Sequence, residues 1–128
     1  MPTILVVDDT EAVRGALIKL LEREGYDTRS ASNGREALES LEADAGHPPD
    51  LVLLDIAMPE VDGLDVLESI TRDARWRAMP VIMLTGEHDY HCVRRAEQLG
   101  AKHYLVKATF SVGEMLHHIG RYTKPVCN

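Results

Sequence analysis

The sequence predicts a single α/β domain built as a doubly wound parallel sheet with helices on both faces. Five short apolar runs of strand length alternate along the chain with five segments whose apolar residues recur at helical spacing. The connections are short, and no internal repeat or low-complexity stretch interrupts the alternation. Such alternation is typical of a parallel sheet, because each crossover between parallel strands runs through a helix that packs on the sheet.

The first strand is predicted from Thr3 to Val7, a continuously apolar run rich in β-branched residues that suits burial on both faces. From Thr10 the spacing becomes helical, and Gly25 provides a stop signal. The apolar positions of this helix are Val13, Leu17, Leu20 and Leu21. The segment from Asp27 to Ala31 is a weaker strand candidate.

A second helix is predicted to begin at Asn33, because Asn33 and Glu36 resemble a capping box ahead of an apolar stripe. That stripe consists of Ala37, Leu38 and Leu41. The dipeptide Asn33-Gly34 is also a frequent hairpin turn, but the helical stripe behind it argues against a hairpin.

The most hydrophobic strand candidate runs from Leu51 to Leu54 and places Asp55 at its end. A turn through Met58-Pro59 leads to a third helix, whose apolar positions are Leu64, Leu67 and Ile70. Val81 to Leu84 follows as another buried strand that ends at Thr85.

The last third of the chain predicts a fourth helix from Glu87 to Leu99 and a short strand from Lys102 to Val106 that ends at Lys107. In the final helix, the capping pair and the apolar positions are Ser111, Glu114, Met115, Leu116 and Ile119. We take residues 1–122 as one domain and residues 123–128 as a tail or the stub of a linker.

Composition narrows the class of protein. The chain has 128 residues, 45% hydrophobic and 27% charged, which is the balance of one globular domain. Its net charge of −7 argues against direct binding of nucleic acid or anionic membranes, whose phosphates attract basic surfaces. The apolar runs are too short to cross a bilayer and none resembles a signal peptide, so we expect a cytoplasmic protein. Cys92 and Cys127 lack zinc-site spacing.

Four of the five predicted strands lead directly into residues with polar or charged side chains. These residues are Asp8 and Asp9 after the first strand, Asp55 after the third, Thr85 after the fourth and Lys107 after the fifth. Because the carboxyl ends of parallel strands share one edge of the sheet, the five groups are expected to converge on one pocket. The second strand contributes no such group, as expected of an outer strand.

Three carboxylates, a hydroxyl and an ammonium in one pocket suit phosphoryl transfer. Carboxylates that lie close together repel one another unless a hard divalent cation lies among them, and Mg²⁺ is the cation that best matches oxygen ligands and phosphate. The hydroxyl and the ammonium can bind oxygens of a transferring phosphoryl group. A carboxylate between metal and ammonium can be the nucleophile and become an aspartyl phosphate.

The chain resembles the response-regulator receiver domains of two-component signalling systems over Thr3 to Tyr122. The residues that carry the resemblance are Val6-Val7-Asp8-Asp9, Leu54-Asp55-Ile56-Ala57-Met58-Pro59, Asp62-Gly63, Leu84-Thr85-Gly86, Gly100-Ala101 and Tyr104-Leu105-Val106-Lys107. Their joint order and spacing make the signal specific. We therefore expect the flavodoxin-like strand order 2-1-3-4-5.

The resemblance implies that Asp55 receives a phosphoryl group from a phosphohistidine on a sensor histidine kinase. It also implies that Asp9, Asp55 and the backbone carbonyl of Ala57 bind Mg²⁺ directly, with Asp8 acting through a metal-bound water. The domain would assist its own phosphorylation and dephosphorylation without being an enzyme in the ordinary sense.

Phosphoryl oxygens would be bound by Thr85 and Lys107, and Tyr104 would move inward as Thr85 is drawn to the phosphate. Tyr104 also alternates with apolar neighbours, which suits simple packing. Relatives commonly pair as homodimers or dock through the face of the fourth helix, fifth strand and fifth helix. Here that face includes Arg94, Arg95, Lys102 and His103. The implied partners are a kinase or phosphotransfer protein and a downstream effector domain or target protein.

Two positions depart from the family's pattern. Lys107 is followed by Ala108, whereas relatives usually carry proline with a cis peptide bond at this position. We therefore expect a trans Lys107-Ala108 bond and a shifted loop from Ala108 to Phe110. The Lys107 side chain would then reach the site by a different rotamer from that of its relatives. Ala57 and Glu87 would flank the path of an attacking water. Neither is suited to orient that water beside a phosphoryl group, so slow self-dephosphorylation is expected.

Three other functions agree with parts of the sequence. A phosphatase similar to haloacid dehalogenases needs a second Asp two residues after the nucleophile, where this chain has Ala57. A flavodoxin-like cofactor carrier needs a phosphate loop, but Asp8-Asp9-Thr10-Glu11 would repel a flavin phosphate. A pseudo-receiver that only docks to partners stays open, although retention of all five site residues argues against it.

Several residues have simpler readings. His88 and His91 could form half of a metal site, but the sequence suggests no third ligand for it. A polar, solvated helix face is the better interpretation. His117 and His118 are expected at the surface. Trp76 either packs locally or forms a contact patch, and the sequence does not decide between the two.

Overall fold

A parallel sheet of five strands forms the centre of the computed structural model, which describes residues 2–58, 61–86 and 90–123. The strands are β1 (Thr3–Val7), β2 (Asp27–Ala31), β3 (Leu51–Asp55), β4 (Val81–Thr85) and β5 (His103–Val106). The helices are α1 (Glu11–Arg23), α2 (Gly34–Ala43), α3 (Gly63–Arg72), α4 (Tyr90–Gln98) and α5 (Val112–Gly120). The strand order β2-β1-β3-β4-β5 confirms the predicted arrangement.

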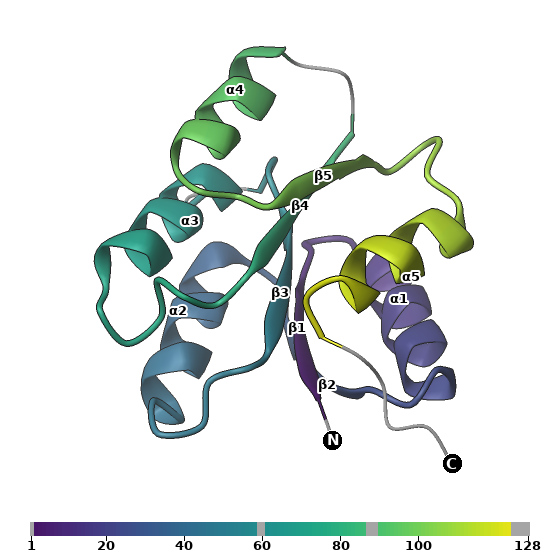
Figure 1. Ribbon diagram of the computed structural model, residues 1–128, viewed down its shortest axis with the longest axis horizontal. Helices are drawn as coiled ribbons and strands as arrows, with labels where there is room; N and C mark the ends of the chain where they lie inside the picture. The colour runs from purple at the N-terminus through teal and green to yellow at the C-terminus, as the bar shows by residue number, and fades with distance from the viewer. Residues whose placement is uncertain (1, 59–60, 87–89, 124–128) are drawn as a thin grey trace.

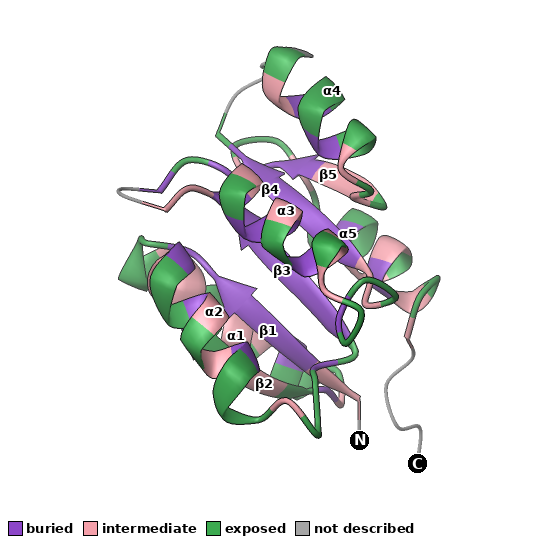
Figure 2. Cartoon of the chain, turned by 90° about the vertical axis from the view of Figure 1, so that its left-hand side faces the viewer, coloured by how far each residue is buried: buried purple, intermediate pink, exposed green. Residues whose placement is uncertain are grey.

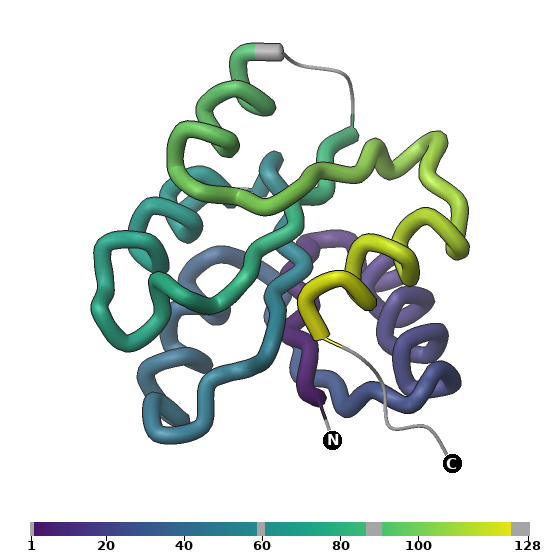
Figure 3. The backbone as a smooth tube through the Cα atoms, in the orientation of Figure 1, coloured from purple at the N-terminus to yellow at the C-terminus, as the bar shows by residue number. Residues whose placement is uncertain are grey.

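Every connection between consecutive strands passes through a helix, as the trace of the chain shows (Figure 3). Helices α1 and α5 cover one face of the sheet, and α2, α3 and α4 cover the other (Figure 1). Two separate apolar clusters follow from this division, because alternate residues of a strand point to opposite faces. Leu5 and Val7 of β1 pack with α2 and α3, whereas Ile4 and Val6 pack with α1 and α5.

The inner strands of the sheet are covered on both sides, and their sequences show it. Every residue of β3 and β4 is buried, whereas β2 at the outer edge is buried only at Ala31 (Figure 2). The weak strand signal of residues 27–31 therefore reflects the half-exposed position of β2.

Three helices begin with a side-chain cap. The side chains of Asn33, Asp62 and Ser111 accept hydrogen bonds from the backbone N–H groups three residues later. The capping box at α2 differs in one respect from the prediction, because the Glu36 carboxylate accepts from the backbone N–H of Ser32 at 3.2 Å. Asn33-Gly34 begins a helix, which excludes the hairpin turn.

The predicted ends of the elements agree with the structure within a residue or two. Gly25, with φ 96°, and Gly100, with φ 97°, adopt the left-handed conformation that ends a helix. Helix α4 ends at Gln98 and β5 begins at His103, each one residue from the predicted boundary. Positions 87–89 of the predicted fourth helix, including His88, lie outside the described residues.

Trp76 packs inside the fold. Its side chain is buried in the connection between α3 and β4, and the Arg75 guanidinium lies 4.3 Å from the centre of the indole ring. Local packing, one of the two readings of the sequence, is therefore the correct one. None of the helices in the described ranges has both the length and the apolar character that a membrane span requires.

Candidate functional site

The register of the sheet brings the ends of four strands to one edge. Val7 of β1 is paired with Leu54 of β3, Asp55 with Leu84 of β4, and Thr85 with Val106 of β5. Asp8 therefore follows β1 next to Asp55, and Lys107 follows β5 next to Thr85. The five groups that the sequence identified converge at this carboxyl edge, where α/β sheets bind ligands.

Three carboxylates form the acidic part of the site. Oxygens of Asp8, Asp9 and Asp55 all lie within 4.8 Å of one another. Asp8 and Asp55 are buried, with 0% and 1% of their surface exposed, whereas Asp9 faces solvent. The Asp8 carboxylate also accepts a hydrogen bond from the backbone N–H of Thr10 at 2.8 Å, which fixes its orientation after β1.

The Lys107 ammonium forms ion pairs with two of these acids. Its Nζ lies 2.7 Å from Oδ2 of Asp8 and 3.0 Å from Oδ2 of Asp55. The ion pair with Asp8 was not predicted from the sequence. The backbone N–H of Lys107 donates to the carbonyl of Thr85 at 2.7 Å, which holds the start of the loop. The Lys107-Ala108 peptide bond is trans, as expected.

Burial and neighbouring charges set the protonation of the site. Burial raises the pKa of Asp55 to about 6; Lys107 opposes this shift, and Asp8 and Asp9 add to it. Burial lowers the pKa of Lys107, but its contacts with Asp8 and Asp55 outweigh burial and leave that pKa raised. Lys107 is therefore charged at neutral pH, and Asp55 is mostly ionised above pH 7.

The donor set fits a hard divalent cation. Three carboxylates face one ammonium, so negative charge is in excess, and oxygen ligands of this kind are those that Mg²⁺ prefers. The acidic group of Asp8, Asp9 and Asp55 could hold such an ion. Ala57, whose carbonyl is the fourth expected ligand, is exposed two residues after Asp55.

Gly63 supports the end of β3. Its backbone N–H donates to the carbonyl of Ile56 at 2.8 Å, and a side chain at this position would collide with the backbone carbonyl oxygen of Asp55. The first turn of α3 can therefore pack directly on the segment that carries Asp55. The sequence marked Asp62-Gly63 as part of a motif without revealing this close approach.

Arg14 is a site neighbour that sequence reasoning missed. Its Nη1 donates to the backbone carbonyl of Asp8 at 2.8 Å and so ties α1 to the acidic loop. The available signal was a basic residue near the start of the helix that follows the two acids. Only the fold shows that its side chain reaches back to the loop that carries these acids.

Thr85 and Tyr104 lie on the same face of the sheet. Thr85 is buried at the end of β4, and Tyr104 is paired with Met83, two residues earlier in the register. Tyr104 is half-buried and packs against the cluster under α3 and α4. Thr85 and Tyr104 therefore lie two register positions apart on neighbouring strands, and their switch role stays a prediction. Glu87 lies outside the described residues.

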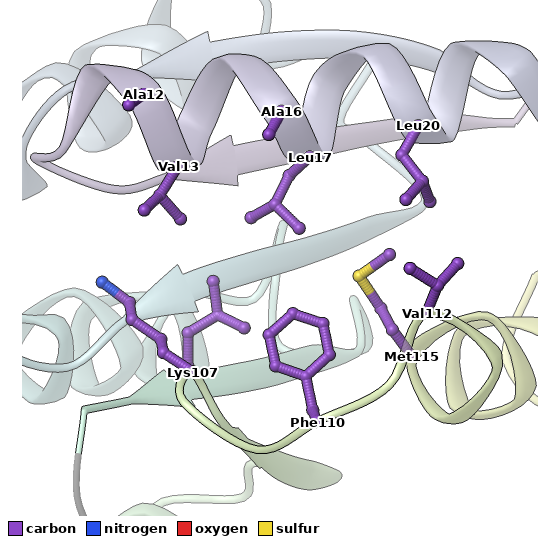
Figure 4. A pocket seen from close by; sticks show the side chains of 10 residues that line it. Ala12, Val13, Ala16, Leu17, Leu20, Lys107, Phe110, Val112 and Met115 are labelled. Atoms are coloured by element: carbon purple, nitrogen blue, oxygen red, sulfur yellow. The ribbon is translucent and has the colours of Figure 1, made fainter.

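An apolar cavity lies beside the site. It has a volume of about 420 Å³ between α1 and α5, and among the described residues that line it Lys107 alone is charged (Figure 4). Val13 and Phe110 are among the apolar residues that flank it. The cavity offers no second polar group for a phosphoryl group, so the acidic edge is the better candidate for chemistry.

Comparison with known proteins gives consistent results. Residues 4–119 match the family described as response regulator receiver domain. The chain is 37% identical over 114 residues to the transcriptional regulatory protein PdtaR of Mycobacterium tuberculosis, covering 88% of this chain and 52% of PdtaR. It is 37% identical to the chemotaxis protein CheY1 of Helicobacter pylori, covering 81% of this chain and 83% of CheY1.

Solved structures show the same architecture. The chemotaxis protein CheY4 of Vibrio cholerae superposes with a TM-score of 0.85 at 27% identity, covering 95% of this chain and 98% of CheY4. A response regulator receiver protein from Pseudomonas putida gives 0.86 at 29% identity, covering 94% of this chain and 96% of that protein. The chain spans about half the length of regulators such as PdtaR.

Proposed function

The chain belongs to the response regulator receiver domain family, and we propose that it is a signalling switch that accepts a phosphoryl group on Asp55. The observation that carries the proposal is the position of Asp55, which is buried beside the acids Asp8 and Asp9 and the Lys107 ammonium. Asp55 combines a nucleophilic oxygen with neighbours that can hold a divalent cation and neutralise a phosphoryl group.

The transfer uses groups already in place. An oxygen of the ionised Asp55 carboxylate attacks the phosphorus of a phosphohistidine or of a small donor such as acetyl phosphate. The new O–P bond forms as the P–N bond to imidazole, or the P–O bond to acetate, breaks, and the leaving group departs with its electron pair. Lys107 lies 3.0 Å from Asp55 and neutralises negative charge on the phosphoryl oxygens.

Mg²⁺, when bound by Asp9, Asp55 and the Ala57 carbonyl, would supply positive charge for the phosphoryl oxygens. Asp8 would contribute through a metal-bound water, and release of Asp8 from its ion pair would leave Lys107 to the phosphoryl group. Ala57 offers only a methyl group to an attacking water, which favours a long-lived aspartyl phosphate.

Switching would follow from the adjacency of Thr85 and Tyr104. The Thr85 hydroxyl binds a phosphoryl oxygen, β4 shifts toward the site, and Tyr104 moves inward on β5. The face formed by α4, β5 and α5 would then change its affinity for an effector domain, a target protein or a second copy of the chain. The donor would be a sensor histidine kinase or a phosphotransfer protein, and the domain would act in the cytoplasm.

The proposal is tested by incubating the protein with acetyl phosphate, with Mg²⁺ or with EDTA. We expect a mass increase of one phosphoryl group only with Mg²⁺. Borohydride reduction, which converts an aspartyl phosphate to homoserine, should place the modification at position 55. The exposed Asp50→Asn variant is the matched control and should label like the wild type. Absence of labelling in all conditions would favour a pseudo-receiver that only docks to partners.

A further inference from the structure

Two histidines from different elements stack face to face where α5 packs beside β5. The ring centroids of His103 in β5 and His118 in α5 lie 3.6 Å apart, and the ring planes are inclined by 24°. His117 lies nearly edge-on to His118, with 5.3 Å between centroids. His103 and His118 are both partly buried. The stack therefore joins the edge strand of the sheet to the last helix by a contact between two titratable rings.

The surroundings of the stack carry charged groups of both signs. The charged or titratable groups near it are Glu114, His117 and Arg121 of α5, Lys102 and Tyr104 beside His103 in the chain, and Glu97 of α4. Burial is the main cause that lowers the pKa of both His103 and His118, and positive neighbours lower it further. Glu114 acts in the opposite direction.

We propose that the His103–His118 stack is a proton-operated latch between β5 and α5, closed when both rings are neutral and opened when they take up protons. Two imidazolium rings at a centroid distance of 3.6 Å would repel each other. Arg121 adds a further positive charge, so the nearby acid does not fully offset this repulsion. Opening requires no phosphoryl group on Asp55, so the latch is a second input to the domain, independent of phosphorylation.

The rest of α5 would stay in place when the latch opens. Met115 and Ile119 are fully buried against the sheet, and the Tyr26 hydroxyl donates to the carbonyl of Thr123 at 3.1 Å just after the helix. The change is therefore confined to the outer side of α5 and β5. A hollow of about 250 Å³ lies there, lined in part by His103, Tyr104 and Glu114. Protonation would alter the shape and charge of this surface.

The direction of the pH response follows from the lowered pKa values. The pKa of each ring is lower in the folded protein than the ordinary histidine value of 6.5. Stacking of the neutral rings therefore stabilises the packed state fully above pH 6.5. This stabilisation is lost as pH falls below about 6.5, because the separated rings bind protons more readily. The latch is thus closed at pH 7.5 and opens under mild acidification.

The test is an NMR titration of the unphosphorylated protein from pH 8 to 5 in EDTA. We expect the His103 and His118 rings to titrate together, below a histidine in a short peptide, and the amides of β5 and α5 to follow with the same midpoint. Amides of α2 should stay unchanged, and the same titration of Asp55→Asn removes the change that Asp55 itself causes at the ends of β1 and β3 as it titrates near pH 6. Titration of both rings like free histidine, or a common midpoint throughout the sheet that indicates global unfolding, would overturn the proposal.

Two variants separate charge from packing. His118→Phe keeps an aromatic ring against His103 but cannot take a proton, so the amide response of α5 should fall by at least half. His47→Gln alters an exposed histidine in the loop before β3 and should leave the response intact. An undiminished response in His118→Phe would show that the stack does not drive the change.

Discussion

Two carboxylates in this protein lie beside a cation, yet their pKa values move in opposite directions. Asp55 lies 3.0 Å from the Lys107 ammonium, and burial raises its pKa to about 6. Asp73 lies 2.7 Å from the Arg75 guanidinium, and the hydrogen bonds from Arg75 lower its pKa to about 2. Contact with a cation therefore does not by itself decide the protonation of an acid.

Solvent access explains the difference. The Asp55 side chain is 2% exposed, whereas that of Asp73 is 25% exposed and its partner Arg75 is 44% exposed. Removing a carboxylate from water disfavours its charged form, and the lysine that Asp55 shares with Asp8 does not offset that cost for Asp55. At the surface, Asp73 keeps much of its hydration and gains hydrogen bonds as well.

The two clusters differ in purpose as well as in pKa. Arg75 also pairs with Glu42 of α2 at 2.6 Å and covers the ring of Trp76, so this cluster joins α2 to the segment that follows α3. The cluster of Asp55 holds unfavourable negative charge that a bound cation can relieve. Destabilising charge is typical of a functional cluster, whereas mildly stabilising ion pairs are typical of a structural one.

The largest expected difference between the clusters is in phosphorylation. Asp55→Ala should abolish labelling by acetyl phosphate in Mg²⁺, because the Asp8 carboxylate is already held by the Thr10 N–H and by Lys107, and Asp9 faces solvent. Asp73→Ala should label at the wild-type rate. Intact-mass spectrometry measures both. Wild-type labelling of Asp55→Ala would contradict the assignment of the acceptor.

Addition of Mg²⁺ should distinguish the clusters by stability. A cation that binds only the folded acidic site raises Tm, and at roughly ten times its Kd the gain should be about 3–6 °C. Asp9→Asn should reduce this gain by at least half, and Asp73→Asn should not. Scanning calorimetry with and without millimolar Mg²⁺ gives the comparison. An unchanged Tm in the wild type would remove the case for a metal site.

Substitution of the strained acid should stabilise the protein. Asp55→Asn removes a buried charge and should raise stability by about 1–3 kcal/mol at pH 7.5 without Mg²⁺. Because its pKa is raised from 3.8 to about 6, wild-type Asp55 destabilises the fold increasingly as pH rises through this window. The advantage of Asp55→Asn should therefore shrink as pH falls from 7.5 to 4.5, as measured by urea unfolding. An advantage independent of pH would mean that packing, not charge, is responsible.

The exposed cluster should respond least. Arg75→Ala removes pairs with Asp73 and Glu42 and the contact with Trp76, so we expect Tm to fall by no more than about 3 °C. The lowered pKa of Asp73 means that the pairing stabilises the fold above pH 3.8 and loses its effect as pH falls through about 2. Half-molar salt should reduce the difference between variant and wild type. A large and salt-insensitive loss would show that the cover over Trp76 dominates.

The element order and the membership of the site could be read from the sequence. The apolar runs of β3 and β4 and the helical spacing in α1 and α3 are local patterns, because a buried face repeats with the period of its own element. The position of Asp8, Asp55, Thr85 and Lys107 at strand ends then follows from one rule, that parallel strands share a carboxyl edge. No distance is needed for that inference.

What only the tertiary structure decided depends on contacts between residues distant in the chain. The Lys107 ammonium bridges Asp8 and Asp55, Arg14 turns back to the carbonyl of Asp8, and His103 meets His118 across two elements. The sequence placed His118 at the surface and could not show its partner. The direction of the Asp55 pKa shift belongs with these contacts, because desolvation is set by the helices and strands that surround the carboxylate and by no pattern in its own segment.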